Sequence, residues 1–161
     1  MPNRHCARPK RAAANLAESS ARWSKLALNC AMSTLGAVSG LSLGELAARR
    51  DARRLALRIL REVAEVAREQ GVTMEPVAGL RPDLLSRAPG PVGEAAIWVA
   101  ARRRPRQRSG MITRLEQGRP AGVEDLNALV PRPFNQRLVD LVHELERGVE
   151  KPGPHLLARL A

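Results

Sequence analysis

Apolar side chains recur along most of the chain at the three- and four-residue spacing of α-helices, and no long stretch alternates as strands do. The clearest helix is predicted over residues 43–70, where Leu55, Ile59 and Val63 mark one side and Gly71 provides a stop. The same spacing predicts further helices over residues 22–39, 94–103, 109–117, 122–130 and 134–147. We therefore expect an all-α fold, a helical bundle without a sheet.

Proline, glycine and charge mark the segments between these helices. Residues 72–93 contain four prolines and are predicted to be a linker with one short helical turn around Pro82–Ser86. Residues 102–108 hold five arginines and Pro105, which predicts a loop. Residues 1–20 are basic and show no apolar period, so we expect a disordered leader followed by one domain over residues 21–161.

The composition supports a single helical domain with an aliphatic core. The 161 residues include only three aromatic side chains, Trp23, Trp98 and Phe134, so leucine, valine, isoleucine and alanine must fill the core. Cys6 and Cys30 belong to no metal-ligand spacing, and no metal site is expected. We expect reduced thiols in a cytoplasmic protein, with Cys30 as a small core residue.

Residues 26–43 carry no charge, but asparagine, serine, threonine and glycine interrupt them too often for a membrane span. The formal net charge is +11, and all but three of the 27 basic residues are arginine. The arginines of residues 49–61 are expected to form a solvated helix face. A nucleic-acid or other polyanion-binding module is the alternative function, with the arginines of residues 102–108 as its contacts and those of residues 49–61 as a second stripe. Scarce aromatic side chains and the absence of a recognisable DNA-binding motif make nucleic acid a disfavoured partner.

Four short motifs occur in a fixed order within this helical pattern. They are Lys25-Leu26-x-x-Asn29, then Gly44-Glu45-Leu46, then Gly110-Met111 followed by Gly118-Arg119-Pro120, and finally Pro133-Phe134-Asn135. Together they resemble the C-terminal domain of ketopantoate reductase (2-dehydropantoate 2-reductase) over about residues 21–148. Each motif is weak alone, but the order makes the resemblance fairly specific.

The resemblance implies the substrate-binding half of an NADPH-dependent reductase that converts ketopantoate to pantoate on the route to pantothenate. It makes Lys25 the general acid and Asn29 a substrate ligand. Ser33 stands where the family has a second asparagine and is expected to bind the same small 2-keto acid. The sequence departs from the family at Gly110, where a substrate-binding serine is expected, and at Gly122, where a glutamate is expected.

The cofactor implied by the resemblance is NADPH, yet no strand followed by Gly-x-Gly-x-x-Gly occurs in the sequence. We therefore expect no cofactor-binding residues here and a truncated or degenerate relative that is inactive alone. A separate nucleotide-binding domain could complete it, and a homodimer partner is a second expected interaction. A helical domain of this kind could also survive as an oligomerisation unit.

Overall fold

The structure is a computed structural model and describes residues 19–161. Residues 19–28 form a helix that continues through a π-helical turn, η1 (Asn29–Ser33), into α2 (Thr34–Ser39). The other elements are α3 (Leu43–Ala48), α4 (Arg50–Glu69), α5 (Pro82–Arg87), α6 (Gly90–Ala101), α7 (Gly110–Glu116), η2 (Val123–Asp125), η3 (Asn127–Leu129), α8 (Pro133–Glu146) and α9 (His155–Leu160). Over these residues no strand forms, and only an isolated bridge joins Val77 to Leu80. The predicted all-α fold is confirmed.

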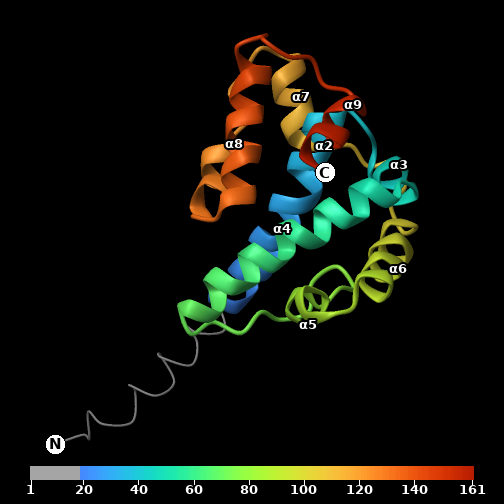
Figure 1. Cartoon of the computed structure of the whole chain (residues 1–161), viewed down its shortest axis with the longest axis vertical. Coiled ribbons are helices and arrows are strands. Elements are labelled where there is room, and N and C mark those ends of the chain that lie inside the picture. The colour runs from blue at the N-terminus through green and yellow to red at the C-terminus, as the bar shows by residue number, and fades with distance from the viewer. Residues whose placement is uncertain (1–18) are drawn as a thin grey trace, which may run out of the picture.

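Two long helical segments form the centre of the molecule (Figure 1). One is the segment over residues 19–39, and the other is α4, which crosses it and packs against η1. Helices α5 and α6 pack on α4, whereas α7 and α8 pack on α2. Helix α9 contacts both α2 and α4, so the end of the chain closes the junction between the central segments.

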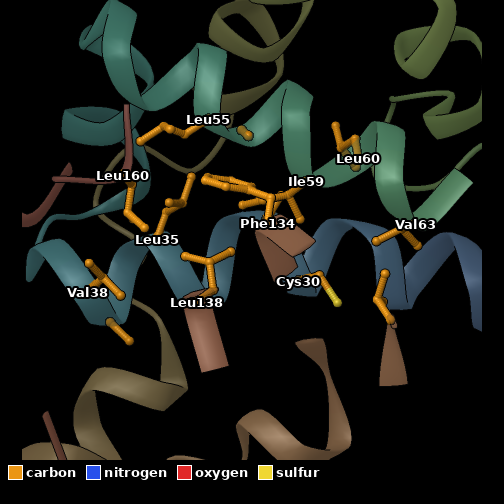
Figure 2. Close-up of a cluster of buried hydrophobic side chains, with 14 of the residues drawn as sticks. Cys30, Leu35, Val38, Leu55, Ile59, Leu60, Val63, Phe134, Leu138 and Leu160 are labelled. Carbon is orange, nitrogen blue, oxygen red and sulfur yellow. The ribbon is translucent and has the colours of Figure 1, made fainter. Parts of the chain in front are cut away.

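The core lies between α2, α4 and α8 and is built from aliphatic side chains around one aromatic ring (Figure 2). Phe134 is fully buried among Leu35, Ile59 and Leu138. Cys30 is also fully buried at the edge of this cluster, as the sequence predicted. Burial raises the pKa of its thiol to about 12, because an apolar environment disfavours the thiolate.

The predicted single helix over residues 43–70 is wrong in one respect, because Arg49 is extended and separates α3 from α4. Each of these helices has its own polar start. The Ser42 hydroxyl and backbone N–H donate to the Glu45 carboxylate while the Glu45 N–H donates to Ser42 Oγ, which is a capping box. Asp51 accepts from the Ala52 N–H and pairs with Arg49 at the start of α4.

Three other boundaries differ from the prediction. The linker is shorter than residues 72–93, because α6 already begins at Gly90, with Pro91 in the first turn where a missing N–H costs little. Residues 122–130 form two 3₁₀ turns rather than a helix. The prediction missed α9, whose buried leucines follow a proline- and glycine-rich stretch. Helices α7, α8 and the turn at α5 lie where they were predicted.

A closed polar network lies on the core side of the π turn. Thr34 Oγ1 donates to Asn127 Oδ1 at 2.5 Å, and Asn127 Nδ2 donates to Asn135 Oδ1 at 2.8 Å and to the Cys30 carbonyl at 3.3 Å. Glu62 completes it by accepting from Asn135 Nδ2 and from two N–H groups at the start of α8. This network ties the central segments to η3 and α8 with every member partnered.

The prediction of a basic leader over residues 1–20 falls almost wholly outside the described residues, and the chain is already helical at residue 19. It stays a prediction. Within residues 19–161 no helix has the length and apolar character that crossing a membrane requires.

Candidate functional site

A cavity of about 430 Å³ opens beside the π turn, lined by Asn29 and Ser33, whereas the neighbouring residues Cys30 and Thr34 contact the polar network. Asn29, Ser33 and Gly36 line it from the central segment, and Ser109 lines it from the start of α7. The turn at residues 78–80 and the loop after α6 line another part of the wall, and apolar side chains from the central segment, α3 and α6 line much of the remainder, among them Met32, Leu46 and Ile97. Its volume lies in the range typical of small-molecule sites.

The π turn gives this cavity its polar wall. A π turn interrupts the regular hydrogen-bond ladder of an α-helix, and such turns are frequent at functional sites. The carbonyl of Ser33 accepts from Ser109 Oγ at 2.7 Å. The Asn29 amide and the Ser33 hydroxyl are half-buried and have no hydrogen-bond partner among residues 19–161. These two side chains can therefore hydrogen-bond a ligand in the cavity.

Two glycines allow the neighbouring segments to approach closely enough to enclose the cavity. A β-carbon at Gly36 would lie 3.0 Å from the Ser109 β-carbon, so the start of α7 packs directly on α2. A β-carbon at Gly44 would lie 2.8 Å from the carbonyl oxygen of Pro105. The N–H groups of Leu43 and Gly44 instead donate to the loop carbonyls of Gln107 and Pro105, which fixes the loop after α6 beside the cavity.

Three arginines of that loop line the cavity, and no acidic side chain does. Arg108 is paired with Glu116 at 2.8 Å. Arg103 and Arg104 form no ion pair or side-chain hydrogen bond within the described part of the chain. The cavity therefore presents amide and hydroxyl groups on one wall and two uncompensated guanidinium groups on another, an arrangement suited to an anionic ligand.

The arginines of α4 lie elsewhere and have other contacts. Arg50, Arg53 and Arg54 surround the buried carboxylate of Glu94 at 3.5, 3.7 and 3.3 Å. Arg58 stacks on the ring of Phe134, with 4.2 Å between the guanidinium carbon and the ring centroid. The expected solvated face is thus partly a set of ion-paired and stacked side chains that fasten α6 and α8 to α4.

Residues 19–146 match the model of the family described as ketopantoate reductase PanE/ApbA C terminal. The chain belongs to this family. The match covers most of the described residues and confirms the resemblance carried by the four motifs. No curated protein and no solved structure matches the chain.

Two of the three site residues expected for a ketopantoate reductase domain lie together in the cavity. Asn29 and Ser33 both line it, one turn apart. Lys25 lies one turn before Asn29 on the same helix, but its side chain is exposed and is not part of the cavity wall. The structure thus brings the expected substrate ligands together and leaves the expected general acid outside the wall.

Sequence reasoning did not single out Ser109, and it named Arg103 and Arg104 only as contacts of the alternative polyanion-binding module, not as ligands of a keto acid. Ser109 directly precedes the position where the family serine was expected, and its hydroxyl lines the cavity while accepting from the Met111 N–H at 3.1 Å. The run of arginines is visible in the sequence. That it lies beside the cavity depends on the close contact between Gly44 and Pro105, which the sequence does not show.

The two glycine departures have different structural meanings. A β-carbon at Gly110 would meet open space, so a side chain could be restored there. Gly122 has a φ of +85°, which strains any residue with a side chain, and a β-carbon there would force the Arg114 guanidinium to move. The Glu124 carboxylate is hydrogen-bonded to His143, with 2.7 Å between Oε1 and Nε2, and Glu124 does not line the cavity. It therefore does not replace the glutamate expected at Gly122.

The residues present do not fit NADPH. Dinucleotide-binding loops connect a strand to a helix through open glycines, whereas over residues 19–161 no strand forms and Gly36 and Gly44 are closed against Ser109 and Pro105. These residues also contain no group of three or more histidine, cysteine, aspartate or glutamate side chains able to hold a metal ion.

Proposed function

We propose that this chain is the substrate-binding half of a reductase of the ketopantoate reductase type, acting on a small 2-keto acid. Asn29 and Ser33 would hold the substrate, and Lys25 would donate the proton. The reductant would be held outside residues 19–161, by a separate nucleotide-binding domain or chain.

The observation that carries this proposal is the pair of unpartnered polar side chains in the cavity. Polar groups that serve only the fold are hydrogen-bonded when they are buried, as those around Asn127 are. Asn29 and Ser33 lie on the same helix within one turn of that network, but their polar atoms are not buried and have no partner among the described residues, so they are available to a ligand in the cavity. Their amide and hydroxyl groups can bind the carboxylate and ketone oxygens of a keto acid.

The reaction requires a proton at a defined place. Reduction of a ketone leaves negative charge on its oxygen, and a lysine ammonium can neutralise that charge by donating a proton. Lys25 is the lysine nearest in sequence to the cavity wall, one helical turn before Asn29. Because its side chain is long and exposed, it can extend toward a substrate held by Asn29 when a second domain covers the opening.

The proposal is tested by measuring NADPH oxidation with ketopantoate after adding a separately expressed nucleotide-binding domain of a ketopantoate reductase. We expect turnover only in the mixture. Lys25→Ala should lower it by about 10²- to 10⁴-fold, the usual contribution of a general acid. Lys151→Ala is the matched control, because Lys151 is exposed and does not line the cavity.

Equal rates for Lys25→Ala and Lys151→Ala would remove Lys25 from the mechanism. Turnover by the chain alone would show that it binds the cofactor itself. That result would contradict the proposal that a separate domain or chain holds the reductant. If the mixture oxidises NADPH with neither ketopantoate nor any other small 2-keto acid, the chain is not half of a reductase.

Polyanion binding through residues 102–108 is the second candidate function, because all seven residues are exposed. Against it, Arg102 stacks on Trp98, Arg108 pairs with Glu116, and Arg103 and Arg104 line the cavity. Retention of one nucleic-acid sequence at physiological salt would favour this second candidate. Retention that disappears at moderate salt would indicate charge alone.

A further inference from the structure

The two unpaired arginines of the cavity exceed what a substrate with a single carboxylate needs. We infer that this site selects a 2-keto acid that carries a second anionic group, which Arg103 and Arg104 bind. This inference rests on the proposed function and adds a substrate class to it.

The first step in the argument is the charge of the cavity wall. Three guanidinium groups line it, and only that of Arg108 has a carboxylate partner, Glu116, among the described residues. Arg103 and Arg104 are adjacent in the chain and carry like charges, which repel each other unless a counter-ion lies between or beside them. A dianionic ligand would supply two such charges within one molecule.

The second step is the way the fold holds Arg103 at the opening. Val77 and Leu80 exchange two backbone hydrogen bonds of 2.8 and 2.9 Å across a two-residue turn. Both central residues of this turn have positive φ, +52° at Ala78 and +79° at Gly79, as a type I′ turn requires. The Arg103 guanidinium occupies the space that a β-carbon at Gly79 would fill. A side chain at position 79 would displace it.

The turn itself is unusual. Ala78 is the only residue other than glycine with positive φ in the described part of the chain, and it lines the cavity. Such a conformation costs on the order of 1–2 kcal/mol for a residue with a side chain. Backbone strain of this kind concentrates at ligand-binding sites. Here the strained turn places Gly79 directly beside the Arg103 guanidinium, and the loop fixed by Gly44 lies next to the same opening.

The third step is the position of these charges relative to the polar wall. Asn29 and Ser33 belong to the central segment, whereas Arg103 and Arg104 belong to the loop that the α3 N-terminus anchors beside the cavity. One ligand can therefore place its keto-acid end at the amide and hydroxyl groups and its other end at the arginines. A monoacid with an apolar tail would contact the apolar side chains of the lining, such as Leu80 and Ile97, but would leave both guanidinium groups without a partner.

The test compares two acids of the same length. 2-Oxoglutarate and 2-oxopentanoate have the same five-carbon skeleton and the same keto-acid end, but the first ends in a carboxylate and the second in a methyl group. Binding of each to the full chain is measured by NMR titration at about 0.1 M salt. We expect 2-oxoglutarate to bind about 3- to 30-fold more tightly, from one or two partly exposed ion pairs. The preference should shrink at 0.5 M salt, because exposed charges are screened.

Variants assign the effect to residues. Arg103→Gln and Arg104→Gln should each reduce the preference for 2-oxoglutarate and leave the affinity for 2-oxopentanoate within about twofold. Arg106→Gln is the control, because Arg106 lies in the same exposed segment and does not line the cavity.

Equal affinities for the two five-carbon acids, both lost in Asn29→Ala, would overturn this inference and leave the proposed function intact. A preference for 2-oxoglutarate that persists in both arginine variants would also overturn it. Absence of binding by either acid at millimolar concentration would contradict the proposed function and this inference together.

Discussion

The two sides of the π turn differ in how their polar groups are satisfied. On the core side, Thr34, Asn127 and Asn135 bond one another, and no buried side-chain polar atom in residues 19–161 lacks a partner. On the cavity side, Asn29 and Ser33 lie half-buried without a partner among those residues. Adjacent residues are thus divided between the two sides, because Cys30 is fully buried in the core while Asn29 lines the cavity.

This difference separates a structural role from a binding role. A satisfied network rigidifies the fold and leaves nothing for a ligand to bind. Unpartnered polar groups contribute little to folding and are free to bind one. Substitutions on the two sides should therefore affect different measurements, stability on the core side and affinity on the cavity side.

The largest expected effect is on the core side. Asn127→Ala leaves the Thr34 hydroxyl, the Asn135 carbonyl oxygen and the Cys30 carbonyl without their partner. Because unsatisfied buried polar groups are costly and the site cannot collapse freely, we expect a loss of about 2–4 kcal/mol of unfolding free energy in urea titrations. Asn29→Ala is the matched control and should cost less than about 0.5 kcal/mol. Equal losses of unfolding free energy in the two variants would contradict the distinction between a structural side and a binding side.

The burial of Cys30 predicts a dependence of stability on alkaline pH. The folded-state pKa is about 12 against an ordinary value of 9.0, so the thiol is protonated in both states below pH 9. Between pH 9 and 12 the unfolded state ionises first, and stability falls by about 1.4 kcal/mol per pH unit.

At pH 10.5 the chain should therefore have lost about 2 kcal/mol relative to pH 8 through this group. The measurement is the difference in unfolding free energy between the chain and Cys30→Ala at both pH values. The other titratable groups contribute equally to both proteins, so their contributions to the pH dependence subtract out of that difference. No change of the difference with pH would show that Cys30 is accessible to water.

The smallest effects are expected at Gly110 and Gly122, where the resemblance led us to expect a serine and a glutamate. Gly110→Ser should change unfolding free energy by less than about 0.5 kcal/mol, because the position is open. Gly122→Ser should cost at least about 1 kcal/mol, because its positive φ and the nearby Arg114 oppose a side chain. The losses of stability in the two variants are compared by thermal denaturation. A larger loss in Gly110→Ser than in Gly122→Ser would contradict the account of these two positions.

Regular helices could be predicted from the sequence, whereas interruptions that depend on remote contacts could not. Helix α8 was predicted over residues 134–147, because its apolar spacing is regular and Gly148 ends it. The π turn was not predicted, since its carbonyls accept hydrogen bonds from Ser109 and Asn127, which lie 76 and 97 residues further along the chain. The break at Arg49 was also missed, because one apolar period runs through both α3 and α4.

For the site, the motif predicted Asn29 and Ser33, and both line the cavity. Lys25 could be named from the motif, but its distance from a substrate depends on a side-chain position that spacing does not encode. The sequence indicated Arg103 only as a polyanion contact and not as part of this cavity, because its place at the opening depends on the turn at Gly79. Local pattern thus predicts which residues share a helix face, and long-range packing decides which of them meet.

The central claim is that the unpartnered polar groups beside the π turn bind a keto acid. Asn29→Asp tests it most directly, because it preserves the shape of the side chain and places a carboxylate where an anionic ligand must sit. NMR titration of the full chain with 2-oxoglutarate should show saturable binding that Asn29→Asp abolishes, while the urea midpoint stays unchanged. Undiminished binding in Asn29→Asp would contradict the account.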